Sequence, residues 1–425
     1  MLPPPVEEEK FGDLILNPNT DDICKTLLDR YAKSSAAQHC HLCASACAMQ
    51  AILKEEGISP SPAAYFAAVL TAIRDADHAD RDGVAALSAF LSILLPIVDV
   101  KSVPHLKAKD ASLTVVSILE TERDRLAATT VRSLVKCLGF LLLCLDLDDW
   151  DAVKMPLELL FKFTLDQRPK VRRCSQKSVE KVFLAFTGSK NTKKAGNFLL
   201  SMFKRYISFD IPEASSEKQR PKSEHLEALH LLNVFVLVVP TLSKKINIKF
   251  LHDILNIFGC QFSLLTKHLL KLLEAVLKHL DDDDLIPELN NITSSLSAYL
   301  SYSGKNPVDT ILSSSHLLSN VLNKLHSSKP DMWIEIFPIM FTPLTALLDS
   351  KSNSAERSAD ILVGLINCHI NQDSFLIDAN AEMLDSPKSR TMVSVCTLLE
   401  NMICACNAVP NVLILKVISE LFLRL

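Results

Sequence analysis

Four basic residues lie three or four positions apart in one short stretch of this 425-residue chain. If the stretch is helical, a rotation of about 100° per residue places them along one face of the helix. Such a row of cations can bind a phosphate backbone without any catalytic group. The four residues are Lys170, Arg173, Lys177 and Lys181.

The basic character extends beyond this helix. Between Lys162 and Arg205, twelve Lys and Arg residues face only two carboxylates, a local excess of ten positive charges on a chain whose net charge is −4. This contrast indicates an anionic partner, with RNA as the leading candidate. An acidic protein or a nuclear import receptor would also bind such a surface, and a solvated helix face is the alternative without function. The further basic residues that we expect to take part are Lys190, Lys193, Lys194, Lys204 and Arg205.

Arg172 falls on the apolar side of the same helix, where a charge needs a partner. Asp166 closes the preceding turn, and an earlier predicted helix carries Pro156. This pattern resembles one HEAT repeat. The first helix contains a proline, an aspartate follows at the turn, and the second helix starts with a Val-Arg pair. In that repeat the arginine meets the turn aspartates of its own and neighbouring repeats. The resemblance therefore implies a structural role for Asp166 and Arg172.

The composition favours an all-α fold built from such repeats. The chain has 9 Gly in 425 residues and 48% hydrophobic residues, and it lacks repeated strand-turn signals. Residues 341–366 repeat the pattern of proline, turn aspartate and early arginine, and residues 129–143 contain another Val-Arg start. At about 40 residues per repeat, the chain has room for roughly ten helix pairs, so we predict an α-solenoid of HEAT/armadillo-like repeats.

Two groups of residues could bind a metal but are better explained by structure. The cluster His39, Cys40, His41, Cys43 and Cys47 places two cysteines one helical turn apart. Zinc sites usually add a turn and a second ligand pair, so we favour helix packing. The run of aspartates at residues 281–284 lacks the ligand spacing of a calcium loop and is expected to cap a helix. We expect neither a metal nor another cofactor.

Catalytic and membrane signals are also lacking in the sequence. No glycine-rich phosphate loop, HExxH, GxSxG or pair of CxxC motifs occurs. The apolar runs at residues 138–145 and 231–240 are too short to span a bilayer, which takes about 20 residues. We therefore predict a protein that is not an enzyme, with no small-molecule substrate and no membrane association.

The predicted organisation has four parts. Residues 1–20 are expected to form a disordered tail, and residues 21–208 the N-terminal repeats. A charged loop with several prolines and serines follows at residues 209–225, and further repeats occupy residues 226–425. The last predicted helix is apolar to its end, although solenoids need a polar cap. This end indicates either part of a longer protein or a covering partner.

Several phrases of the chain resemble one family in particular. The segments DICKTLLDRYAKSSAAQHCHLCASACAMQAILKEEG, VPHLKAKDASLTVVSIL and RPKVRRCSQKSVEKVF are similar to the N-terminal region of ribosomal RNA-processing protein 12 and its relatives. Cys40 departs from the basic residue that is expected at its position. The resemblance implies a long HEAT-repeat factor of the nucleus and nucleolus, without catalytic residues.

The sequence therefore predicts a helical-repeat scaffold of ribosome biogenesis. The family resemblance implies roles in pre-rRNA processing, small-subunit maturation and export of pre-ribosomal particles. Expected partners are pre-rRNA, pre-ribosomal proteins and nuclear transport machinery, with location in the nucleus and nucleolus and shuttling to the cytoplasm. The alternative is a karyopherin-like nuclear transport adaptor that binds protein cargo.

Overall fold

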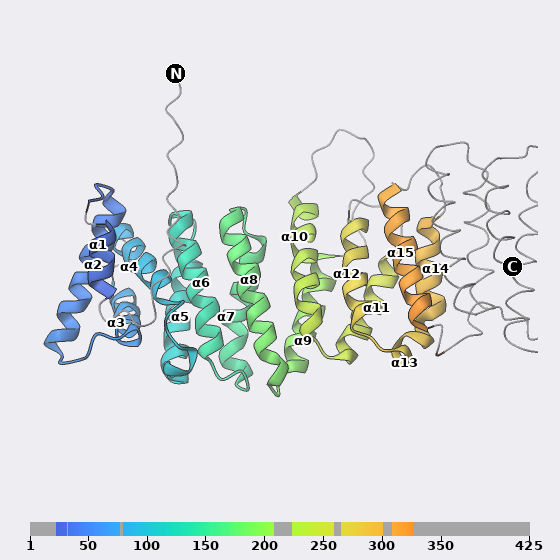
Figure 1. Ribbon diagram of the computed structural model, residues 1–425, viewed down its shortest axis with the longest axis horizontal. Coiled ribbons are helices and arrows are strands. Elements are labelled where there is room, and N and C mark those ends of the chain that lie inside the picture. The colour runs from blue at the N-terminus through green and yellow to red at the C-terminus, as the bar shows by residue number, and fades with distance from the viewer. Residues whose placement is uncertain are drawn as a thin grey trace, which may run out of the picture. The chain divides into compact units, whose positions relative to one another are not determined.

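The computed structural model describes residues 23–31, 33–76, 80–207, 223–258, 265–300, 308–325 and 328. Within these ranges the regular elements are α-helices and short 3-10 helices, with no strand, as predicted (Figure 1). The expected tail, the repeat-like segment 341–366 and the apolar end of the chain lie outside the described residues. The predicted charged loop lies largely outside them as well, so the predicted domain limits stay a prediction.

The chain divides into two compact units, Met1–Gly196 and Asn197–Leu425. In the first unit, consecutive helices form the pairs α1/α2, α3/α4, α5/α6 and α7/α8. Helices α2, α4, α6 and α8 contact one another in succession, and α3, α5 and α7 form the second layer. This stack of helix pairs is an α-solenoid. Its helices are α1 Ile23–Tyr31, α2 Ala37–Glu55, α3 Pro62–Asp75, α4 Arg81–Leu94, α5 His105–Thr121, α6 Ala128–Cys144, α7 Trp150–Lys162 and α8 Pro169–Ala185.

Several of these helices are capped at their N-termini by polar side chains, which accept hydrogen bonds from the backbone N–H groups of the first turn. The hydroxyl of Ser61 accepts a hydrogen bond from the backbone N–H of Ala64 at 3.2 Å. Pro62 fits the first turn of α3 because proline has no backbone N–H, and an N–H at this position would have no partner within the helix. The carboxylate of Asp149 accepts from Ala152 at 3.3 Å at the start of α7. After α2, Gly57 has a φ of +68°, a conformation that glycine adopts without steric cost.

The core of the first unit lies between its two helix layers. Tyr65 and Phe66 of α3 are almost fully buried and make edge contacts with Phe90 of α4 and Phe140 of α6, at centroid distances of 5.7 and 5.5 Å. Pro156 lies inside α7, where the sequence placed it. These contacts tie adjacent repeats together, because α3 packs on helices from two successive pairs.

The second unit repeats the same plan over its described residues. Helices α10, α12 and α15 contact one another in succession, and α11 pairs with α12 and contacts α14. Phe203, Phe235 and Phe250 form a buried aromatic cluster with centroid distances of 5.4–5.7 Å. The helices are α9 Thr192–Tyr206, which spans the boundary between the units, α10 Ser223–Val238, α11 Lys244–Phe258, α12 Thr266–Lys278, α13 Asp282–Leu285, α14 Leu289–Leu300 and α15 Val308–Leu325.

The aspartate run at residues 281–284 has the capping role that the sequence indicated. Asp281 and Asp284 form a reciprocal capping box at the start of α13, and the backbone N–H of Asp281 donates to the Asp284 carboxylate at 3.3 Å. Asp281 also forms an ion pair with Lys244. Three of the four carboxylates therefore serve structure, because Asp282 also accepts a hydrogen bond from the Ser328 hydroxyl.

Candidate functional site

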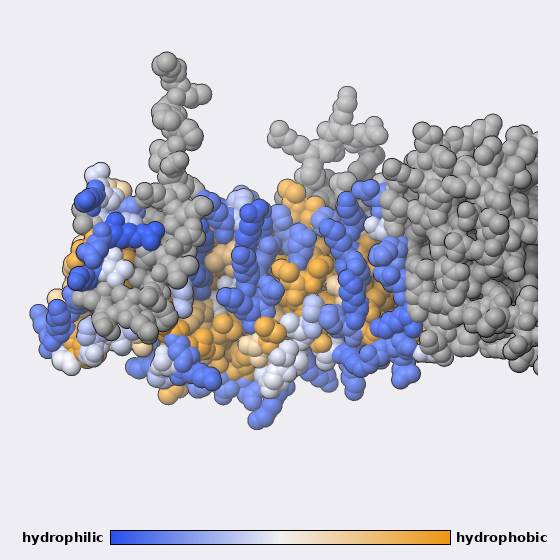
Figure 2. Space-filling view, in the orientation of Figure 1, coloured by the Kyte–Doolittle hydropathy of each residue, from blue (hydrophilic) through white to orange (hydrophobic). Residues whose placement is uncertain are grey.

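Helix α8 has one apolar face and one cationic face. Val171, Val179 and Phe183 are buried at 1% exposure or less, because they face the rest of the first unit. The four residues of the predicted row all lie exposed along α8, where Figure 2 shows a hydrophilic strip. These four are Lys170, Arg173, Lys177 and Lys181.

Helix α6 lies against α8 at unusually close range. A Cβ atom added at Gly139 of α6 would come within 2.5 Å of the Cβ of Ser178 on α8. Only a glycine opposite a small residue permits this approach, which brings the side chains of the two helices onto one surface. The sequence did not identify this close packing, because it depends on residues 39 positions apart.

The packing of α6 on α8 adds two cations to the predicted row. Arg132 and Lys136 of α6 lie beside Cys174 of α8, whose thiol contacts the backbone carbonyl of Arg132 at 3.8 Å. Burial raises the pKa of Cys174, while the nearby charges of Lys136, Arg132, Lys177 and Lys181 act to lower it. The charges of four cations from two helices therefore act on one half-buried thiol. We call Arg132, Lys136, Lys177 and Lys181 the α6–α8 basic cluster.

Lys136 shows how closely these charges are grouped. Its ammonium group donates to the backbone carbonyl of Ser92 on α4 at 3.0 Å. Burial lowers the pKa of Lys136; Cys174 acts to raise it, and the charges of Arg132 and Lys181 act to lower it. A bound anion would relieve the repulsion within the cluster. Sequence reasoning missed Lys136 and Arg132, although Val131-Arg132 repeats the pattern of Val171-Arg172.

The basic residues after α8 are arranged differently. The side chain of Lys190 is 89% exposed and lies 3.6 Å from the carboxylate of Asp148, which also accepts from the Lys190 backbone N–H at 2.9 Å. Lys193 and Lys194 are exposed near the start of α9. Lys204 and Arg205 belong to the second unit, where Lys204 pairs with Asp253 at 3.3 Å. The structure therefore groups the α6 and α8 cations, whereas Lys190 and Lys204 have carboxylate partners.

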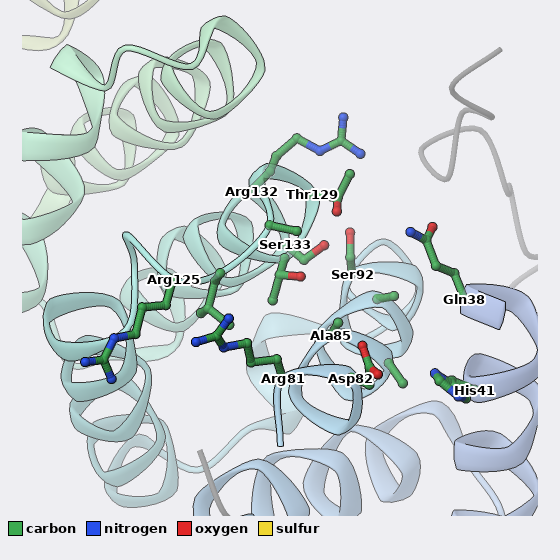
Figure 3. Close-up of a pocket in the computed structure, with 15 residues that line it drawn as sticks. Gln38, His41, Arg81, Asp82, Ala85, Ser92, Arg125, Thr129, Arg132 and Ser133 are labelled. Carbon is green, nitrogen blue, oxygen red and sulfur yellow. The ribbon is translucent and has the colours of Figure 1, made fainter. Parts of the chain in front are cut away.

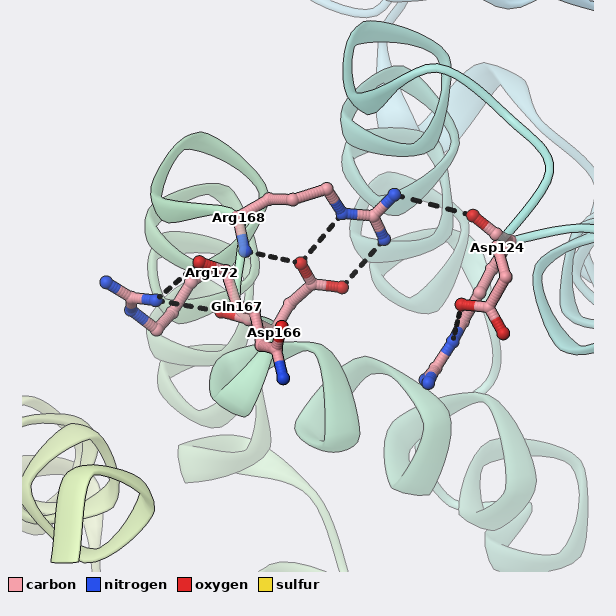
Figure 4. Close-up of polar contacts among 6 residues, drawn as sticks. Asp124, Asp166, Gln167, Arg168 and Arg172 are labelled. Carbon is pink, nitrogen blue, oxygen red and sulfur yellow. Dashed lines mark hydrogen bonds and ion pairs between the residues drawn. The ribbon is translucent and has the colours of Figure 1, made fainter. Parts of the chain in front are cut away.

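The turn before α8 contains a second arrangement of charges (Figure 4). The carboxylate of Asp166 accepts two hydrogen bonds of 2.8 Å from the guanidinium of Arg168 and one of 2.9 Å from its backbone N–H. Burial acts to raise the pKa of Asp166, but these bonds outweigh it and hold the pKa below its ordinary value. Arg168 also donates to the backbone carbonyl of Arg123 in the preceding turn at 3.4 Å. Arg168 thus joins two successive repeats.

Arg172 has a different partner from the one that the repeat resemblance implied. Its guanidinium donates to the backbone carbonyls of Asp166 at 2.8 Å and Gln167 at 3.5 Å, not to a carboxylate. The Asp166 carboxylate is already occupied by Arg168, which follows it by only two residues. Asp166 and Arg172 therefore both support the turn, but Arg168 makes the ion pair, and the sequence argument did not single it out.

The His39–Cys47 cluster packs against α1. The Cys43 thiol contacts the backbone carbonyl of Leu27 at 3.9 Å, and the Cys47 sulfur lies 3.7 Å from that of Cys24. His39 is buried and shares a hydrogen bond of 2.6 Å with the Ser34 hydroxyl. In the part of the chain that the structure describes, no group of three or more His, Cys, Asp or Glu residues could hold a metal ion. Nor does any helix in that part have the length and apolar character needed to cross a membrane.

Stacked helix pairs with a cationic face define this chain as a HEAT-type α-solenoid. Comparison with known families matches residues 10–284 to the RRP12-like N-terminal HEAT repeats. The chain belongs to this family, as its sequence resemblance implied. Over 159 residues it is 28% identical to the RRP12-like protein of Gallus gallus and 26% identical to that of Homo sapiens. In each case the match covers 36% of this chain and 12% of the relative's length.

Proposed function

We propose that this chain is a non-catalytic scaffold of ribosome biogenesis whose α6–α8 basic cluster holds pre-rRNA. Membership of the RRP12-like family supports the process, and the grouping of cations from two helices supports the partner. By family resemblance, the scaffold acts in pre-rRNA processing, small-subunit maturation and export of the pre-ribosomal particle. We propose that the scaffold is located in the nucleolus and nucleus.

The observation that carries the RNA proposal is the arrangement around Cys174. Arg132, Lys136, Lys177 and Lys181 lie within electrostatic range of one thiol, so their charges act on the same small surface. Cations at such spacing contact the phosphates of the nucleic-acid backbone and make no base-specific contacts. Binding should therefore depend weakly on sequence and steeply on salt. The exposed Lys170 and Arg173 extend the same helix face toward the start of α8.

A binding assay with matched variants tests this proposal. Lys177→Glu/Lys181→Glu removes two exposed cations of the cluster, and Lys154→Glu/Lys162→Glu makes the same charge change on exposed positions of α7. Affinity for a labelled 30-nucleotide single-stranded RNA at low salt is measured by fluorescence anisotropy. We expect the first variant to bind at least tenfold more weakly and the second within about threefold of the parent. Equal losses would mean that only net charge matters and would contradict a defined site.

The assignment to ribosome biogenesis has its own test. The tagged chain is purified from nuclear extract with and without RNase treatment, and the associated RNA and proteins are identified. We expect pre-rRNA and pre-ribosomal proteins in the untreated sample, with loss of RNA-dependent partners after RNase. Recovery of transport receptors and cargo without pre-rRNA would instead favour a karyopherin-like adaptor.

A further inference from the structure

A pocket of about 290 Å³ lies on the first unit where α2, α4 and α6 adjoin (Figure 3). Its floor is formed by small side chains, Ala85, Ala86 and Ala89 of α4, because alanines leave a depression between flanking helices. Gln38 and His41 of α2 line one side. The pocket shares Arg132 with the α6–α8 basic cluster, but Lys177 and Lys181 are not among its lining residues.

We propose that this pocket binds an acidic peptide segment of a partner protein, with carboxylates flanking a small or apolar side chain. Three arginines are among the residues that line the pocket, Arg81, Arg125 and Arg132, together with a single acidic residue, Asp82. Arg125 pairs with Glu122 at 3.5 Å but remains 66% exposed. Within the described residues, no ion pair is formed by Arg81 or Arg132.

The lining favours a peptide over a nucleic acid. His41 is the one aromatic residue among the lining side chains, and no Phe, Tyr or Trp is present, so the pocket lacks the successive rings on which the bases of a single strand stack. The alanine floor lets a peptide backbone approach closely, and the hydroxyls of Ser92, Thr129 and Ser133 can hydrogen-bond its amide groups. Guanidinium groups match carboxylates in the bidentate geometry that fixes a peptide's register. The charge and the apolar floor together fit alternating acidic and apolar residues.

The test uses a fluorescein-labelled dodecapeptide that repeats Glu-Ala-Glu-Leu, with a matched peptide in which Gln replaces Glu. We expect the full chain to bind the acidic peptide and not the Gln peptide. Arg81→Glu/Arg125→Glu changes two exposed side chains and should weaken binding at least tenfold. Ala89→Phe should do the same by filling the floor without changing charge. Lys177→Glu/Lys181→Glu, the variant that tests the RNA proposal, should bind the peptide within twofold of the parent.

The outcomes separate this proposal from RNA binding. The peptide proposal would be wrong if the parent did not bind the acidic peptide, or if Lys177→Glu/Lys181→Glu weakened peptide binding as much as Arg81→Glu/Arg125→Glu does. Either result would leave the RNA-binding proposal unaffected. If Arg81→Glu/Arg125→Glu weakens binding of poly(uridine) and not of the peptide, the pocket is a nucleic-acid site and the proposal is wrong. If Ala89→Phe does not fold, as judged by circular dichroism, the exposed arginine pair still decides the matter.

Discussion

Arg168 holds the carboxylate of Asp166 through two parallel hydrogen bonds of 2.8 Å, and the same guanidinium reaches the carbonyl of Arg123 in the preceding turn. The Asp166 side chain is only 8% exposed, so its charge depends on this partner. One side chain therefore both neutralises a turn aspartate and joins consecutive repeats. The hydrogen bond from Arg168 to Arg123 thereby links the turn before α8 to the turn between α5 and α6.

Replacing Arg168 with Ala should destabilise the first unit by about 2 kcal/mol. The substitution leaves a largely buried carboxylate without its charged donor, and hydrogen bonds to charged groups contribute about 1.5–3 kcal/mol. Arg173→Ala, at an exposed position on α8, should cost less than about 0.5 kcal/mol. Urea denaturation followed by circular dichroism measures both. Equal effects of the two substitutions would show that the ion pair does not stabilise the turn.

Asp166 should make stability depend on pH in the acid range. Its pKa in the folded chain lies below its ordinary value, which is about 3.9 for an unfolded aspartate. The stabilisation is therefore fully present above that unfolded value and is lost as the pH falls through the folded pKa. Urea midpoints between pH 6 and pH 2.5 should fall less steeply for Asp166→Asn than for the parent. Parallel curves would assign the acid sensitivity to other carboxylates.

Gly139 should be incompatible with any larger residue while Ser178 is present. The added Cβ of Gly139→Ala would overlap the Ser178 side chain, and such overpacking typically costs about 1–3 kcal/mol. In a Ser178→Gly background the same change should become neutral or stabilise by up to about 1 kcal/mol, because alanine favours helix. A double-mutant cycle in urea measures the coupling. Additive effects would mean that α6 and α8 do not meet at these residues.

The salt dependence of RNA binding should reveal how many cluster cations contact phosphates. For single strands, each neutralised phosphate contributes about 0.7 to the slope of log affinity against log salt concentration. Lys177→Gln and Lys181→Gln should each lower the magnitude of this slope by about that amount. Lys154→Gln on α7 is the matched control and should leave it unchanged. A lower affinity with an unaltered slope would indicate that the lysines act without touching the RNA backbone.

Local features of this protein could be determined from the sequence. The apolar and cationic faces of α8 follow from a repeat of 3.6 residues per turn, so Val171 and Arg173 could be assigned to opposite sides before any contact was known. The family could also be named, because its characteristic phrases are continuous in the chain. The sequence also placed Asp166 at the turn before α8 and Arg172 early in α8, because the pattern of one repeat is continuous in the chain.

Only the tertiary structure decided which groups become neighbours. Arg168 meets a carbonyl 45 residues earlier in the chain, and Arg132 lies beside a helix that begins more than 30 residues later. The pocket between α2, α4 and α6 likewise exists only because three separate repeats adjoin. Helical periodicity is set by bonds between residues four apart, whereas these contacts depend on how closely stacked helices approach, as at Gly139. That distance is a property of side-chain packing between repeats, which no single segment of sequence specifies.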